Sequence, residues 1–173
     1  MKILFIEFIV FAFLVSNIKY SFGQDVFKPY DSKEQLESDV RIIINDFDRF
    51  MKDMGTSPPY VPSVKIQTAP FLIKWDEPNK GLILPFWDEL SKEQMELFKI
   101  WQGENAEEFF ISLFNWFFIP HELGHFMVLN NPNINLTPYE SERAANEFAV
   151  KFLTSKSENQ KKFSTLKNHY QRY

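Results

Sequence analysis

The chain has 173 residues, of which 45% are hydrophobic and 24% charged, and its formal net charge is −4. This composition is typical of one folded globular domain and excludes a disordered chain. The lysine and arginine residues are scattered, so the sequence indicates no basic surface for a nucleic acid. Cysteine is absent, so any metal must be bound by His, Asp, Glu or backbone oxygen.

Residues 1–23 have the layout of a secretory signal peptide. Lys2 provides a positive start, residues 3–15 form an apolar run interrupted only by Glu7, and Ser21 and Gly23 are small residues before a cleavage point. The run is shorter than the about 20 residues that a membrane span needs, which favours cleavage over membrane anchoring. We therefore expect residues 24–173 to form one exported bacterial domain, periplasmic or secreted, without stable membrane association after cleavage.

The first half of this domain predicts a helix followed by a small sheet. Residues 32–35 (SKEQ) read as a capping box that opens a helix running to about Gly55. Its apolar face recurs at spacings of four and three: Leu36, Val40, Ile43, Phe47 and Phe50. Three short β-prone segments follow at residues 64–69, 71–75 and 80–84, with a turn at residues 77–81.

The second half is helical, which makes the expected fold class α+β. Capping boxes begin at Ser91 and Thr137, and helices are expected at residues 91–103, 106–130, 137–154 and from residue 157 onward. Pro120 lies within the second of these helices. It either kinks the helix or belongs to the first turn of a new one.

The residues most informative about function are His121-Glu122-Leu123-Gly124-His125. Residues four apart lie on one face of a helix, so both imidazoles can reach one metal ion. Glu122 is offset by about 100° and can reach a water molecule beside the metal. Two nitrogen ligands beside a carboxylate base are what a hydrolytic zinc site requires, so the motif predicts Zn²⁺ with Glu122 as the general base.

A catalytic zinc site uses three protein ligands, and the next helix offers three glutamates. We expect Glu142 to be the third ligand and Asn146, one turn later on the same face, to hydrogen-bond a ligating histidine or the neighbouring backbone. Glu140 is better explained as the capping residue, but Glu140 and Glu147 remain alternatives. Small residues on both helices predict a close approach between them: Gly124, Ala144 and Ala145.

These motifs resemble those of zincin metallopeptidases with a glutamate third ligand. The second motif, Glu142-x-x-Ala145-Asn146-x-Phe148-Ala149, is most similar to ImmA/IrrE-type peptidases and to uncharacterised exported bacterial metallopeptidases. The resemblance covers residues 121–149. It implies that His121, His125 and Glu142 bind zinc, that Glu122 is the general base and that Asn146 supports a ligand.

The same resemblance implies a zincin-like fold, in which a small N-terminal sheet packs on the helix pair that carries the site, with flanking helices. The chain departs from the ImmA/IrrE type in starting with an export signal, whereas that type is cytoplasmic. It also has no recognisable regulatory domain. The regulatory role of that family is therefore not expected here.

The predicted function is an exported zinc-dependent metallopeptidase that hydrolyses peptide bonds in a peptide or protein substrate. Tyr139 and His169 are candidates for stabilising the transition state. Residues 80–86 are either the sheet edge that pairs with an extended substrate or an ordinary core strand.

Two other functions fit parts of the sequence. One is a non-catalytic zincin-fold module that binds a metal or a protein partner. The other is an intramembrane protease, because residues 109–129 are mostly apolar. A buried core helix explains that segment more simply, since the polar residues of the motif interrupt it.

Overall fold

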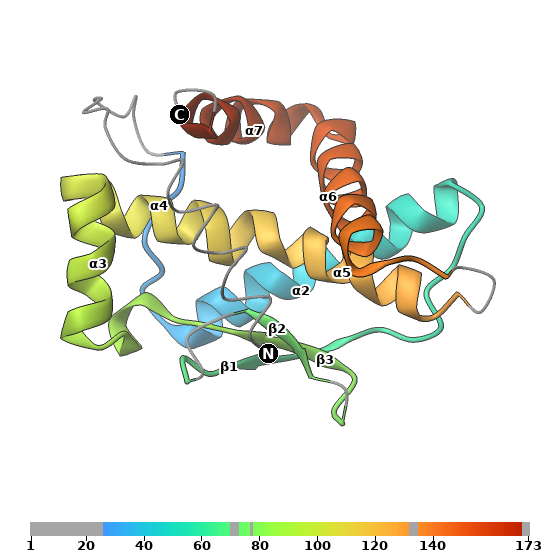
Figure 1. Cartoon of the computed structure of the whole chain (residues 1–173), viewed down its shortest axis with the longest axis horizontal. Helices are drawn as coiled ribbons and strands as arrows, with labels where there is room; N and C mark the ends of the chain where they lie inside the picture. Colours follow the sequence, from blue (N-terminus) through green and yellow to red (C-terminus); the bar gives the residue numbers. More distant parts are fainter. Residues whose placement is uncertain (1–25, 70–72, 77, 132–134, 171–173) are drawn as a thin grey trace.

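The computed structural model describes residues 26–69, 73–76, 78–131 and 135–170. Over these residues the protein is α+β, with mostly helices and one small sheet (Figure 1). The signal peptide predicted for residues 1–23 lies outside the described residues, so it and the 24–173 domain remain predictions. None of the helices in the described part of the chain combines the length and apolarity that crossing a bilayer requires.

The first described helix, α2, begins where its capping residue predicts. It spans Lys33–Asp53, and the Ser32 hydroxyl accepts a hydrogen bond from the backbone N–H of Gln35. The Gln35 side chain accepts from the N–H of Asp31 instead of Ser32, so only half of the predicted capping box forms. One side-chain cap is still enough to satisfy an N–H group that the helix itself leaves unpaired.

The buried face of α2 is wider than its sequence spacing predicts. Ile43 and Phe50, expected in the core, are half-buried. The helix packs on both α5 and the sheet, so the buried stripe of its surface is broader than a single neighbouring element would bury. The fully buried side chains are those of Leu36, Val40, Ile44, Phe47 and Met51.

The sheet has three strands in the described residues: β1 (Ser63–Ile66), β2 (Lys74–Asp76) and β3 (Gly81–Leu84). Their order is β1-β3-β2, with β1 parallel and β2 antiparallel to β3. Of the two alternatives for residues 80–86, the sheet edge is wrong and the core strand is confirmed, because β3 is the central strand and all four of its residues are buried. A continuous apolar run has both faces to bury, and only a central, covered position does this.

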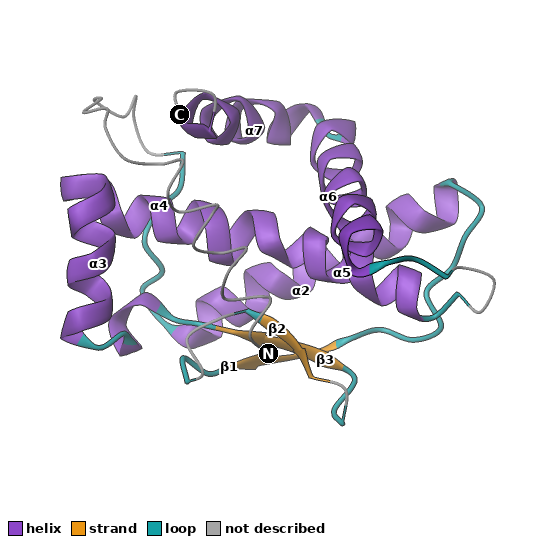
Figure 2. Ribbon diagram, viewed as in Figure 1, coloured by secondary structure: helices purple, strands orange, loops and turns teal. Residues whose placement is uncertain are grey.

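The remaining helices build two layers above the sheet. Figure 2 shows the sheet on one side of the molecule, α2 and α5 next to it, and α6 on the opposite side of α5. Their bounds are α3 (Lys92–Gln102), α4 (Ala106–Ser112), α5 (Phe118–Leu129), α6 (Pro138–Ser155) and α7 (Ser157–Tyr170).

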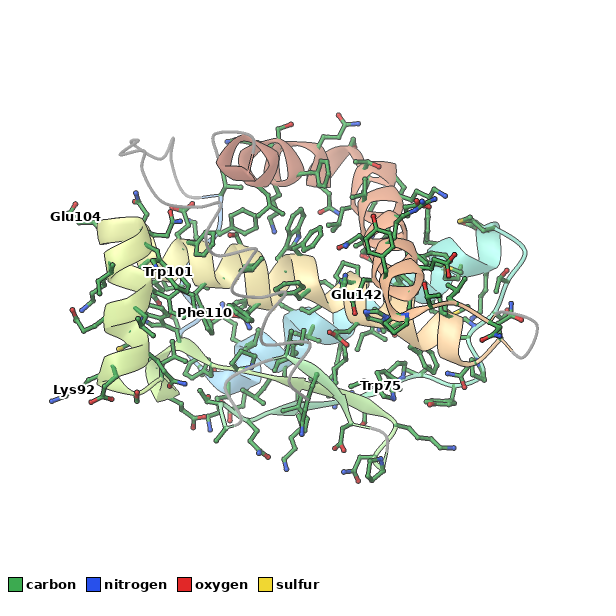
Figure 3. The ribbon with its side chains drawn as sticks, in the orientation of Figure 1. Trp75, Lys92, Trp101, Glu104, Phe110 and Glu142 are labelled. Carbon is green, nitrogen blue, oxygen red and sulfur yellow. The ribbon has the colours of Figure 1, made fainter. Side chains whose placement is uncertain are left out.

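Aromatic side chains hold α3 against α4. Phe98 of α3 is 1% exposed, and its ring is perpendicular to those of Phe110 and Phe114, with centroids 5.5 and 6.0 Å apart. Such edge-to-face pairs add to the free energy of burying the rings. Figure 3 shows Phe110 and Trp101 in this part of the molecule, and Glu142 at the other end, where α5 and α6 cross. Ring contacts extend from this cluster along the helix through Phe114 and Phe118 to His121, whose ring centroid is 5.5 Å from that of Phe118.

The long helix predicted for residues 106–130 is continuous but not uniform. A π turn, Leu113–Phe117, joins α4 to α5. Pro120 is the third residue of α5, but Phe117 before α5 is helical as well, so Pro120 lies inside a continuous helix and not at the start of a new one. In an α-helix, the N–H that proline lacks would donate to the carbonyl of Trp116, four residues back. Trp116 lies within the π turn, where the α-helical hydrogen bonds are already interrupted.

Candidate metal centre

Helices α5 and α6 approach each other closely at Gly124. A β-carbon added to Gly124 would lie 2.9 Å from Cα of Ala145, 3.1 Å from its carbonyl oxygen and 3.2 Å from Cβ of Phe148. Only glycine fits there, because real Cβ atoms essentially never approach other atoms that closely. The close approach predicted from Gly124 and Ala145 is therefore present, and it brings side chains of the first turns of α6 onto α5.

The start of α6 is determined by a complete capping box. The Thr137 hydroxyl accepts from the N–H of Glu140, and the Glu140 carboxylate accepts from both the N–H and the hydroxyl of Thr137. Pro138 occupies the first helical position, where its lack of an N–H costs nothing. Glu142 is thus one turn into the helix, and Glu140 is committed to the cap.

Three side chains from these two helices converge. Nε2 of His121 and Nε2 of His125 are 3.1 Å apart. Glu142 directs one carboxylate oxygen to each ring: Oε2 is 3.4 Å from Nε2 of His121, and Oε1 is 3.2 Å from Nε2 of His125. One possible ligand atom from each residue lies within 4.8 Å of the others, and among the described residues no other group of three such side chains is close enough to hold a metal ion.

The other ring nitrogen of each histidine is held by α6. Nδ1 of His121 donates to Oδ1 of Asn146 at 3.1 Å, so the histidine is the partner of Asn146 among the two that the sequence predicts. Nδ1 of His125 hydrogen-bonds with the Ser141 hydroxyl at 3.1 Å. With both Nδ1 atoms engaged, both Nε2 atoms face Glu142, which is the orientation that metal-binding histidines need.

Ser141 was not predicted from the sequence. It lies about 100° around the helix from Glu142 and on the same face as Ala145, four residues on, which packs against Gly124. That signal is weak, because serine near a helix start is common for capping reasons. Only the packing of α6 on α5 shows which histidine its hydroxyl meets.

The site is buried on one side and open on the other. His121 is 6% exposed, whereas the Glu142 side chain is 36% exposed. Hydrogen bonds from His121 and His125 hold the pKa of Glu142 far below its ordinary value, against the opposing effect of burial. Burial by itself would lower the pKa of His125, but the hydrogen bond and charge of Glu142, helped by Glu122, outweigh it and raise that pKa.

Glu122 lies on α5 next to these residues and is half-buried. Burial raises its pKa above the ordinary glutamate value, with a smaller contribution in the same direction from Glu142, while His121 and His125 oppose the shift. A carboxylate whose pKa is moved towards neutrality is better suited to accept a proton near pH 7.

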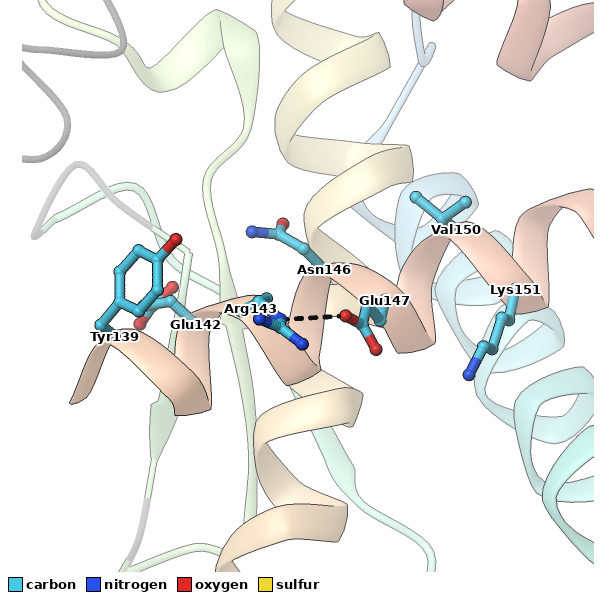
Figure 4. A pocket seen from close by; sticks show the side chains of 7 residues that line it. All are labelled: Tyr139, Glu142, Arg143, Asn146, Glu147, Val150 and Lys151. Atoms are coloured by element: carbon cyan, nitrogen blue, oxygen red, sulfur yellow. Dashed lines mark hydrogen bonds and ion pairs between the residues drawn. The ribbon is translucent and has the colours of Figure 1, made fainter. Parts of the chain in front are cut away.

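Glu147 and Tyr139, two further residues of α6 considered for the site, lie outside this cluster. Glu147 pairs with Arg143 at 3.1 Å, and both are exposed (Figure 4). Tyr139 is 72% exposed, so its proposed role depends on a substrate being present. The side chain of His169 lies outside the described residues, and its role remains a prediction.

An open groove runs along the outer face of α6. It has a volume of about 440 Å³ and extends from Tyr139 past Glu142 and Asn146 to Lys151 (Figure 4). Glu142 and Asn146 therefore belong both to the histidine cluster and to this groove. The cluster is reached from solvent along α6.

Comparison of the chain with known protein families, with curated proteins and with solved structures finds no match. Any functional conclusion consequently depends on the residues and their geometry.

Proposed function

We propose that this protein is an exported zinc-dependent metallopeptidase of the zincin type, with His121, His125 and Glu142 as the metal ligands. The observation that carries the proposal is the convergence of these three ligand atoms within 4.8 Å of one another. The Nδ1 atoms of both histidines are at the same time hydrogen-bonded to Asn146 and Ser141 of α6. The zincin-like fold and the export are part of the proposal and rest on the sequence motifs.

The donor set fits zinc in both chemistry and spacing. Two ligand atoms bound about 2.0–2.1 Å from a tetrahedral zinc ion lie about 3.3 Å apart. The distances between the Nε2 atoms, and from each to the nearest Glu142 oxygen, are 3.1, 3.2 and 3.4 Å. Two imidazoles and one carboxylate are also a common catalytic zinc set, which leaves one coordination position for a small molecule.

The metal, when bound, would supply Lewis acidity that lowers the pKa of water and polarises a carbonyl group. Glu122 then accepts a proton from water as the water oxygen attacks the peptide carbonyl carbon. When the C–N bond breaks, Glu122 delivers that proton to the leaving amine, so the carboxylate returns to its starting state. Asn146 and Ser141 hold the imidazoles in the orientation that this chemistry needs.

The sheet offers a place for an extended substrate, but at β2 and not at β3. β2 contacts α5, and Trp75 of β2 stacks on Phe126, the residue after His125, with ring centroids 4.7 Å apart. Within the described residues, β2 pairs with β3 alone. We assign the pairing with a peptide backbone to the free edge of β2, since edge strands accept extended peptides as additional strands.

Two measurements test the function. The zinc content of the purified chain is expected to be about one per chain by elemental mass spectrometry and to be lost in His121→Ala. Cleavage of a dye-labelled unfolded protein is expected to be abolished in Glu122→Gln, with the zinc retained.

The outcomes separate the two functions that remain. Zinc in the wild type without any cleavage would refute the peptidase and leave the metal-binding module. Equal cleavage by wild type and Glu122→Gln would refute the role of Glu122 as the general base. A wild-type chain that takes up no zinc would refute the metal centre itself.

A further inference from the structure

The helix that carries both histidines is preceded by a π turn. In Leu113–Phe117 the N–H of Phe118 bonds to the carbonyl of Leu113, five residues back, instead of the four of an α-helix. Such a turn holds one residue more than an α-helical turn. One residue corresponds to about 100° of rotation. The histidines therefore point about 100° away from where an uninterrupted continuation of α4 would direct them.

This rotation decides what the histidines face. Helices α4 and α5 form one nearly continuous rod, and α4 is held in place by the aromatic contacts of Phe109 and Phe110 with Phe98 of α3. With α4 fixed, the direction of His121 and His125 depends on how many residues the connecting turn contains. The π turn sets the direction in which both Nε2 atoms face Glu142 of α6.

A buried asparagine anchors this turn. Asn115 is 1% exposed, although leucine and aromatic residues surround it in the turn. Its side-chain N–H donates to the carbonyl oxygen of Pro85 at 3.0 Å. Pro85 directly follows β3, so this bond ties the π turn to the end of the central strand. A buried polar side chain is retained only when it is hydrogen-bonded, and this bond links segments 30 residues apart.

Pro120 acts at the same place. It lies five residues after Asn115, and the carbonyl that it would pair with in an α-helix belongs to Trp116, inside the π turn. A regular α-helix through this region would lose that hydrogen bond and bring the proline ring against the Trp116 carbonyl. Pro120 thus disfavours the regular helix, and Asn115 favours the π turn.

We propose that Asn115 is a positioning residue of the metal centre: its hydrogen bond to Pro85 stabilises the π turn, which directs His121 and His125 towards Glu142. The inference rests on the proposed function, because it assumes that these three residues bind a metal. Asn115 acts only through α5.

The test uses cobalt(II), which replaces zinc in such sites and reports the ligand geometry by its visible absorption. Asn115→Ala should bind cobalt about tenfold to hundredfold more weakly than the wild type, with a changed spectrum, as when residues that orient metal ligands are lost. Ser112→Ala is the matched control. Ser112 is 2% exposed, and its hydroxyl donates within the same helix to the Phe109 carbonyl, before the π turn. This variant should keep the wild-type affinity and spectrum.

Asn115→Ser serves as the milder variant if Asn115→Ala does not fold, and it should give the same spectral change to a smaller extent. A folded Asn115 variant with the wild-type spectrum and affinity would overturn this inference alone. Equal weakening in Ser112→Ala would also overturn it, because the effect would then reflect general stability. A wild-type chain that binds neither cobalt nor zinc would overturn the proposed function together with this inference.

Discussion

Replacing Gly124 by alanine tests whether the α5–α6 contact sets the geometry of the metal centre. The new β-carbon would lie 2.9 Å from Cα of Ala145 and 3.1 Å from its carbonyl oxygen, whereas carbon atoms pack at about 3.5–4.0 Å. Both are backbone atoms, so no change of side-chain rotamer relieves the clash. The two helices must move apart by several tenths of an ångström or more.

The magnitude follows from two opposing terms. Overpacking of this kind costs about 1–3 kcal/mol. Alanine gains about 1 kcal/mol over glycine in a helix interior. The metal-free variant should therefore be about 0–2 kcal/mol less stable. Zinc binding should suffer more clearly, because the contacts of His121 and His125 with Glu142, 3.4 and 3.2 Å long, span the same gap between the helices.

The assay combines denaturant unfolding in the presence of a chelator with a competitive zinc titration. Ala144→Gly is the control. Its lower helix propensity should destabilise the protein by about 1 kcal/mol, within the range expected for Gly124→Ala, but it adds no atom at the contact between the helices. It should lose stability but keep its zinc affinity. A Gly124→Ala protein that is more stable than the wild type and binds zinc equally well would refute the reasoning.

Three further predictions concern the same site. Asn146→Ala and Ser141→Ala should each weaken zinc binding about tenfold to hundredfold, because each removes the hydrogen bond to Nδ1 of one histidine. Competition with a chromogenic chelator measures the affinity. Unchanged affinity in both variants would contradict the assigned orientation of the rings. In the metal-free protein, the raised pKa of His125 adds stability below about pH 6.5 that disappears as the pH rises through its folded-state pKa. The lowered pKa of Glu142 adds stability above about pH 4.3 that is lost only as the pH falls through its folded-state pKa. Thermal melts of the protein kept metal-free by a chelator should therefore show a loss of stability above about pH 6.5. The stabilisation by added zinc should grow with pH, because zinc competes with protons for the histidine. Glu147→Gln should leave zinc affinity unchanged and alter stability by at most about 0.5 kcal/mol, as expected for an exposed ion pair, and a loss of zinc would instead identify Glu147 as a ligand.

Features that depend on near neighbours in the chain were predictable from the sequence. The capping residues Ser32, Ser91 and Thr137 each begin a helix where expected, because a side-chain cap bonds to N–H groups only two or three residues away. The four-residue spacing of His121 and His125 places both on one face of a helix, for the same local reason. The capping role of Glu140 was also predictable locally, since Thr137 lies three residues before it, whereas the ligand role of Glu142 stays a prediction.

Features that depend on distant segments were decided only by the tertiary structure. The apolar run of β3 indicates a covered strand, but which strands pair with it, β1 in parallel and β2 in antiparallel, depends on segments that its own residues do not specify. The partner of Asn115 is a carbonyl 30 residues away, so the π turn before the histidines has no local signal comparable to a capping box. The pairing of Ser141 with His125 likewise arises from the packing of α6 on α5 at Gly124. The sequence by itself determined which chemical groups are present and their spacing along each helix. Their orientation towards one another was decided by contacts between helices and strands, because those contacts set how each helix is rotated about its own axis.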